Sequence, residues 1–225
     1  QRYDAGLKAP RPSADMPSVS DNASDNWTRA QVLRDYRFYL ALPAILAPPF
    51  INTGVFFHQV HLSETKGWPL ALFASAFVVY AASTILSSVV MGEFVDRLGS
   101  RRFLPVYLLP MALVLFLLAG FDHPAWAYLF MFGAGVSHGM ATIVHGALWP
   151  EMYGVKHLGA IRALTTSLMV FATALSPVLL GWCFDAQVTV GAVLVACAVY
   201  ILVASALCLL LQTSMAHAVA ATTGR

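Results

Sequence analysis

Two histidines fall on one face of a strongly apolar segment. His138 and His145 are seven residues apart, in a stretch that also contains Gly135 and Gly139. Seven residues of helix return to the same face about 10 Å further along the axis. Two neutral imidazoles on one stripe have the chemistry to carry a proton or to contact an anionic solute. The alternative is a helix-packing face, where the two glycines let a neighbouring helix approach closely.

More polar side chains follow a proline pair in the segment ALPAILAPPFINTGVFFHQVH, residues 41–61. Pro48 and Pro49 lack the backbone N–H, so we expect them to break or kink a helix. Asn52, just past the pair, is a candidate for lining a solute cavity; alternatively, it forms a hydrogen bond between helices. The full set of cavity candidates is Asn52, His58, Gln59, Tyr80, His138 and His145.

No metal, cofactor or catalytic motif accompanies these residues. His58 and His61 form an HxxH pair, but no acid or cysteine completes a metal site. We found no HExxH or GxSxG motif and no paired aspartates within the apolar segments. We therefore expect neither an enzyme nor a bound cofactor.

The elements that hold these residues are predicted to be transmembrane helices. Hydrophobic residues make up 59% of the 225 residues and charged residues only 11%, against roughly 25% charged in soluble domains. Apolar blocks of about 20 residues match the thickness of a bilayer core, and open strands cannot satisfy their backbone in lipid. We predict an all-α transmembrane six-helix bundle over residues 36–212, with spans at 38–60, 69–91, 103–121, 125–149, 160–183 and 188–211.

The distribution of positive charge predicts how these spans are oriented. Twelve of the 13 Lys and Arg residues fall on one side of the predicted spans, and Lys66 alone falls on the other. The side rich in Lys and Arg is normally cytoplasmic. We therefore expect both termini in the cytoplasm, with residues 1–35 as a linker that includes a juxtamembrane helix and residues 213–225 as a tail. We expect the lipid bilayer as a partner, and we expect no nucleic-acid partner.

A charged segment, GEFVDRLGSRR, connects the second and third predicted spans at residues 92–102. Its order of Gly92, Asp96, Arg97, Gly99, Arg101 and Arg102 resembles the signature loop of the major facilitator superfamily. In that family the loop joins the second and third helices of each six-helix half, on the cytoplasmic side. Gly92 would let a helix approach closely, and Gly99 would permit a reversal with positive φ. The alternative is an ordinary positively charged turn.

The resemblance implies a second charged cluster. Residues 149–164, WPEMYGVKHLGAIRAL, resemble the loop that follows the fourth helix of each half in this family. There, acidic and basic residues join the signature loop in a gating network. By this resemblance Glu151, Arg162, Asp96 and Arg101 would form such a cluster. The alternative is that these charges only set the topology.

The resemblance also implies a function. We expect a secondary transporter that moves a small solute by alternating access, with this chain as the C-terminal half of a twelve-helix protein of the bacterial inner membrane. The missing N-terminal six-helix half would be its partner. An organic anion is one candidate for the solute, although span 69–91 lacks the basic residue expected of organic-anion carriers. The alternative is a self-associating six-helix module without transport activity.

Overall fold

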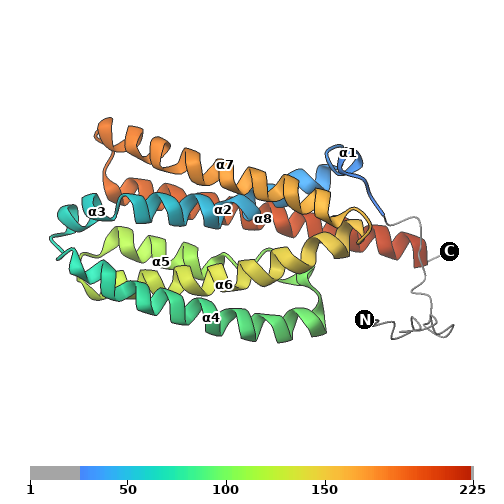
Figure 1. The fold of residues 1–225 in the computed structure, drawn as a ribbon, viewed down its shortest axis with the longest axis horizontal. Coiled ribbons are helices and arrows are strands. Elements are labelled where there is room, and N and C mark those ends of the chain that lie inside the picture. Colours follow the sequence, from blue (N-terminus) through green and yellow to red (C-terminus); the bar gives the residue numbers. More distant parts are fainter. Residues whose placement is uncertain (1–25, 224–225) are drawn as a thin grey trace, which may run out of the picture.

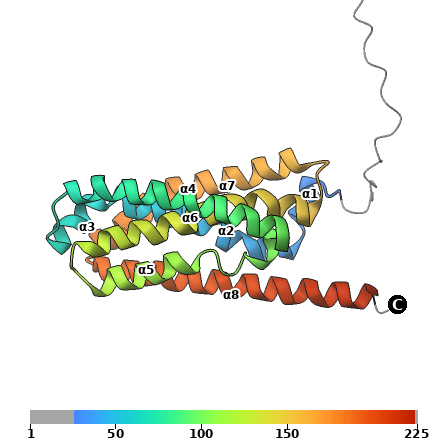
Figure 2. The ribbon, with the colours of Figure 1, turned by 90° about the horizontal axis from the view of Figure 1, so that it is seen from below.

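The computed structural model describes residues 26–223, with side chains for residues 26–213, and all regular structure in this range is helical. The helices are α1 (Arg29–Val32), α2 (Tyr36–Phe57), α3 (Gln59–Lys66), α4 (Ala71–Leu98), the 3-10 turn η2 (Ser100–Arg102), α5 (Leu109–Gly120), α6 (Ala125–Tyr153), α7 (Leu158–Asp185) and α8 (Val190–Thr223). The long helices run side by side along one axis (Figures 1 and 2).

The bundle has two ends, which we name by their turns. The Gly99 end carries η2, the turn between α6 and α7, and α1; the Gly67 end carries the turns that follow α3, α5 and α7. Within the bundle, α4 packs mainly on α6, α2 packs on α7 and α8, and α5 packs on α6 and α8.

Five of the helices are long and apolar enough to cross a membrane: α2, α4, α6, α7 and the Val190–Thr213 part of α8. The expected span at 103–121 is shorter than predicted. Its helix, α5, has 12 residues, or about 18 Å at 1.5 Å per residue. Residues 103–108 form successive turns instead. Pro110 explains the late start, because it has no N–H to bond the carbonyl of Val106.

The first predicted span differs from expectation at its prolines. Pro43, Pro48 and Pro49 all lie inside α2, which stays helical from Tyr36 to Phe57. The helix ends instead at His58, whose φ of −93° and ψ of 18° separate α2 from α3. The proline pair therefore does not break the helix.

The segments on either side of the bundle are described in part. The juxtamembrane helix is only the four-residue α1, capped by Thr28, and Asp35 caps α2 through a bond from the Arg37 N–H. The expected tail continues the helix, because α8 runs to Thr223. Residues 1–25 of the expected linker lie outside the described residues.

Glycines set the close contact between α4 and α6. A Cβ added at Gly135 would lie 2.5 Å from the Tyr80 carbonyl oxygen. One added at Gly139 would overlap the Thr84 carbonyl oxygen and the Ser87 hydroxyl. The two backbones therefore touch here, and the packing role considered for these glycines is confirmed.

Candidate functional site

Most of the GEFVDRLGSRR segment is helix. Residues 92–98 are the last two turns of α4, and the chain reverses at Gly99, whose φ is +80°. A side chain at that φ is strained, so the expected need for glycine at this position is confirmed. Gly92 does not play its expected part within the described residues, since a Cβ there would have nothing within 4 Å.

Glu151, near the end of α6, contacts the reversal after α4. Its Oε1 atom accepts a hydrogen bond from the Ser100 N–H at 2.9 Å. The Arg101 Nε lies 3.8 Å from Glu151 Oε2, and the Arg101 guanidinium also donates to the Glu151 carbonyl oxygen. The side chain of Gln212, on α8, donates to the Arg101 carbonyl oxygen. Three helices therefore meet around Arg101 and Glu151.

The expected four-residue charge cluster is only half assembled. Arg97 pairs with Glu93, one turn earlier on α4. Asp96 and Arg102 are exposed and make no ion pair with the described residues. Arg162 lies away from the cluster and donates to the Gly146 carbonyl oxygen at 2.7 Å. Only Arg101 and Glu151 are brought together.

A second set of contacts at the Gly99 end was not foreseen from the sequence. The Tyr153 hydroxyl, at the end of α6, donates to Asp35 Oδ2 at 3.0 Å. The Tyr153 carbonyl oxygen accepts from the Trp27 N–H at 3.0 Å, and Asn26 Oδ1 accepts from the Lys156 N–H. The segment before α2 is thereby fixed to the turn between α6 and α7.

A cavity with polar lining lies between α2, α6 and α7 and has a volume of about 360 Å³. Two of the predicted cavity residues, His138 and His145, line it. Its other polar side chains are Thr142, Arg162, Thr165 and Thr166, and its apolar lining includes Ile45, Pro48, Pro49, Trp149 and Met169. No acidic residue is part of this lining.

A carbonyl group of α2 is left without its helical partner by Pro48, which lines the cavity. In a helix, the N–H of residue 48 would bond the carbonyl of Ala44, but Pro48 has no N–H. The Tyr107 hydroxyl donates to that oxygen at 2.6 Å. Tyr107 comes from the turns before α5, so a distant segment stabilises α2 at its proline.

The same tyrosine fixes the tautomer of His145. His145 Nε2 lies 3.0 Å from the Tyr107 hydroxyl oxygen. The single hydroxyl proton is committed to Ala44, whose oxygen only accepts, so Nε2 must carry the hydrogen. In neutral His145 the Nδ1 atom is then an acceptor.

The same arrangement occurs on α6. Pro150, inside α6, has no N–H for the carbonyl of Gly146, and the Arg162 guanidinium donates to that oxygen from α7. The sequence did contain a signal for this unpaired carbonyl, because Pro150 follows Gly146 by four residues. The donor could not be identified without knowing how α7 packs against α6.

The remaining predicted cavity residues lie elsewhere. Asn52 is buried, and neither its Oδ1 nor its Nδ2 has a hydrogen-bond partner among the described residues. Tyr80, on α4, packs its ring 5.4 Å from Phe56 and 5.8 Å from His138. Gln59 is the first residue of α3 and is half-buried.

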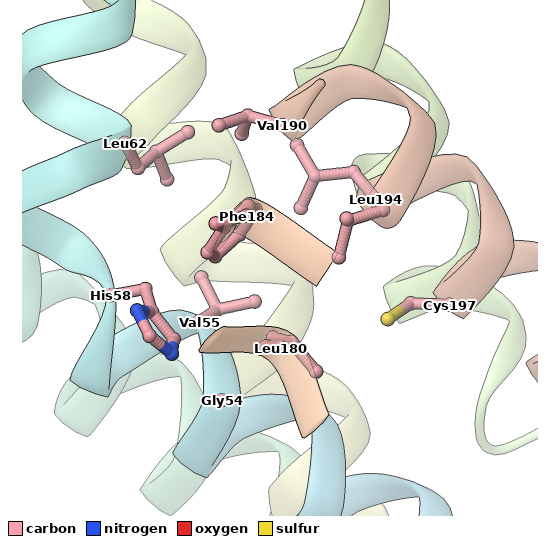
Figure 3. A pocket seen from close by; sticks show the side chains of 10 residues that line it. Gly54, Val55, His58, Leu62, Leu180, Phe184, Val190, Leu194 and Cys197 are labelled. Atoms are coloured by element: carbon pink, nitrogen blue, oxygen red, sulfur yellow. The ribbon is translucent and has the colours of Figure 1, made fainter. Parts of the chain in front are cut away.

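His58 faces a separate, small apolar pocket toward the Gly67 end. Figure 3 shows its ring beside Val55 and Phe184, with Leu62, Val190 and Leu194 around the space. The pocket holds only about 20 Å³, enough for about one water molecule. His58 Nε2 lies 3.0 Å from the Pro177 carbonyl oxygen, so it donates to that oxygen and joins α2 to α7. No group of three metal-binding side chains occurs in the described residues.

The helical bundle, with its five apolar membrane-length helices, defines an integral, multi-pass membrane protein. The family model of the Major Facilitator Superfamily matches residues 43–224. The chain therefore belongs to this superfamily, whose members are membrane transporters rather than enzymes, as the resemblance of residues 92–102 indicated. No curated protein matches the chain.

Proposed function

We propose that this chain forms the C-terminal six-helix half of a secondary transporter that moves a small solute by alternating access. The observation that carries this proposal is the 360 Å³ cavity between α2, α6 and α7. In secondary transporters, solute sites lie where two structural repeats face each other. A cavity with an arginine and two histidines, in an otherwise apolar bundle, suits one side of such a site.

The Gly99 end supplies the second element of the proposal, a gate. The ion pair between Arg101 and Glu151 would hold α4 and α6 together, while Gly92, Asp96, Arg97 and Arg102 would face the N-terminal half. Supporting this, the space beside Gly92 is open, and Asp96 is exposed without a partner in the described residues. The excess of Lys and Arg at this end favours a cytoplasmic location in a bacterial inner membrane.

Cysteine labelling tests alternating access without knowledge of the solute. In the full-length gene product with Cys183, Cys197 and Cys208 replaced by Ala, Thr142→Cys places a thiol in the cavity. We expect a membrane-impermeant maleimide to label it from both faces of oriented vesicles. Labelling from one face only, or from neither, would contradict alternating access and favour a module without transport.

Two exposed positions serve as controls for sidedness. Val155→Cys lies in the turn between α6 and α7, and Ala186→Cys lies in the turn after α7, at opposite ends of the bundle. Each should react from one face alone, and Val155→Cys should react from the cytoplasmic face. The reverse result would overturn the proposed orientation.

A further inference from the structure

The cavity contains a cation whose charge no described acidic group neutralises. Arg162 lines the cavity from the first turns of α7 and, within the described residues, donates to the neutral carbonyl oxygen of Gly146. The ion pairs among the described residues join Lys66 to Asp122, Arg97 to Glu93 and Arg101 to Glu151, and Arg162 takes part in none. Arg162 is exposed and lies just past the first turn of α7, and an unpaired cation on a membrane-length helix is a candidate binding site.

The carbonyl of Gly146 orients this cation without neutralising it. Because Pro150 leaves that oxygen free, one N–H of the guanidinium is held by α6. A guanidinium carries five N–H donors in a planar fork, so four remain for another ligand. That fork fits the two oxygens of a carboxylate.

The neighbouring groups suit the same ligand. His138 and His145 line the cavity with Arg162 and supply no negative charge. The hydroxyls of Thr142 and Thr165 donate to carbonyl oxygens of their own helices and, being neutral, leave the charge of Arg162 without a counterion. Beside these groups, Trp149 and Met169 provide apolar surface for a carbon skeleton.

We propose that Arg162, held on the carbonyl that Pro150 frees, binds the carboxylate of a small organic anion, which is the transported solute. This rests on the proposed transport function and names its substrate class. It also assigns Arg162 to the solute cavity instead of the gating network.

Carboxylic acids compared with their amides test this proposal, because the two molecules of each pair have nearly the same shape and differ in charge. The full-length gene product is purified, and its melting temperature is measured with lactate, benzoate and succinate and with lactamide, benzamide and succinamide. We expect at least one acid to raise the melting temperature and its amide to leave it unchanged. Arg162→Gln should weaken binding of that acid by roughly tenfold to a hundredfold, the loss of a hydrogen-bonded charge. Arg34→Gln, on the exposed segment before α2, should have no effect.

A double variant separates binding from folding. In Pro150→Ala the restored N–H at position 150 can bond the Gly146 carbonyl, so the fold no longer needs a donor at position 162. We expect Pro150→Ala/Arg162→Gln to melt near the unliganded wild type and still to show no shift with the acid. If this folded double variant binds the acid as tightly as the wild type, the proposal is overturned.

The other outcomes distinguish the inference from the transport function. A neutral solute that binds and is transported equally well in Arg162→Gln would overturn the substrate class and leave transport standing. An acid that binds through Arg162, without two-sided labelling of Thr142→Cys, would leave the anion site standing and overturn transport. If no acid has an effect, the protein is compared in phosphatidylglycerol and phosphatidylcholine vesicles. A higher melting temperature in phosphatidylglycerol that is lost in Arg162→Gln would identify a lipid headgroup as the ligand. No shift with any acid or vesicle would also overturn the proposal.

Discussion

Glu151 Oε1 accepts a hydrogen bond from the Ser100 N–H at 2.9 Å, which joins the last turns of α6 to the reversal after α4. The ion pair with Arg101 is longer, at 3.8 Å, and half-exposed. The backbone hydrogen bond, rather than the charge pair, should therefore contribute most of the stability of this contact.

This balance predicts different effects for two substitutions of Glu151. Glu151→Gln keeps an oxygen acceptor for Ser100 and loses only the ion pair, so we expect a cost below about 1 kcal/mol. Glu151→Ala leaves the buried Ser100 N–H without this partner and should cost about 1–3 kcal/mol. Chemical denaturation in detergent measures both. Equal losses would show that the charge dominates.

The contact between α4 and α6 predicts a steric effect at Gly139. A methyl group there meets the Thr84 backbone, which has little room to move, so we expect Gly139→Ala to destabilise the protein by about 1–3 kcal/mol. Gly120→Ala is the matched control, because a Cβ at Gly120 has nothing within 4 Å. Thermal melting of the two variants should differ clearly, and a Gly139→Ala variant as stable as Gly120→Ala would argue against the close packing.

The hydrogen bond from the Tyr107 hydroxyl predicts that substitutions at Tyr107 and Pro48 have coupled effects on stability. Tyr107→Phe removes the donor for the Ala44 carbonyl and should cost about 1–3 kcal/mol. Pro48→Ala restores a helical N–H to the same oxygen, so it should reduce the cost of Tyr107→Phe in the double variant. A double-mutant cycle measures this coupling. Strict additivity would contradict the role assigned to Tyr107.

Replacing Asn52 by an apolar residue is expected to stabilise the protein. Its buried amide has no hydrogen-bond partner among the described residues, so burial costs free energy that is not recovered. We expect Asn52→Leu, which has a similar size, to raise the free energy of unfolding by about 1 kcal/mol or more. Asn52→Asp, equally buried but charged, should lower it. A loss of stability in Asn52→Leu would indicate that the amide has a partner outside the described residues.

The helices that the sequence predicted well are those with one long apolar run. The spans predicted at 125–149 and 160–183 lie inside α6 and α7, and the span predicted at 69–91 begins two residues before α4, because a long, mainly apolar run satisfies its backbone in lipid as a helix. The span predicted at 103–121 was too long. Hydropathy does not register Pro110, which has no N–H for the carbonyl of Val106, and α5 begins only at Leu109.

The candidate site was predictable only where one helix carries the information. The shared face of His138 and His145 follows from their spacing, and the reversal at Gly99 follows from its residue type. The position of Arg162 did not follow, because its charge suited a loop cluster as well as a cavity. Its bond to Gly146 depends on how α6 and α7 pack, which no local pattern encodes.

The proline-released carbonyls also bear on how the protein enters the membrane. A helix inserted alone would carry the Gly146 oxygen into lipid without its partner, at a cost of several kcal/mol. Its donor, Arg162, is only 16 residues away, so α6 and α7 are expected to insert together as a hairpin. The donor to the Ala44 carbonyl oxygen, Tyr107, is synthesised 63 residues later in the chain. Until that segment arrives, α2 is expected to stay close to the translocation channel or to water, and its release into lipid to follow synthesis of the residues before α5.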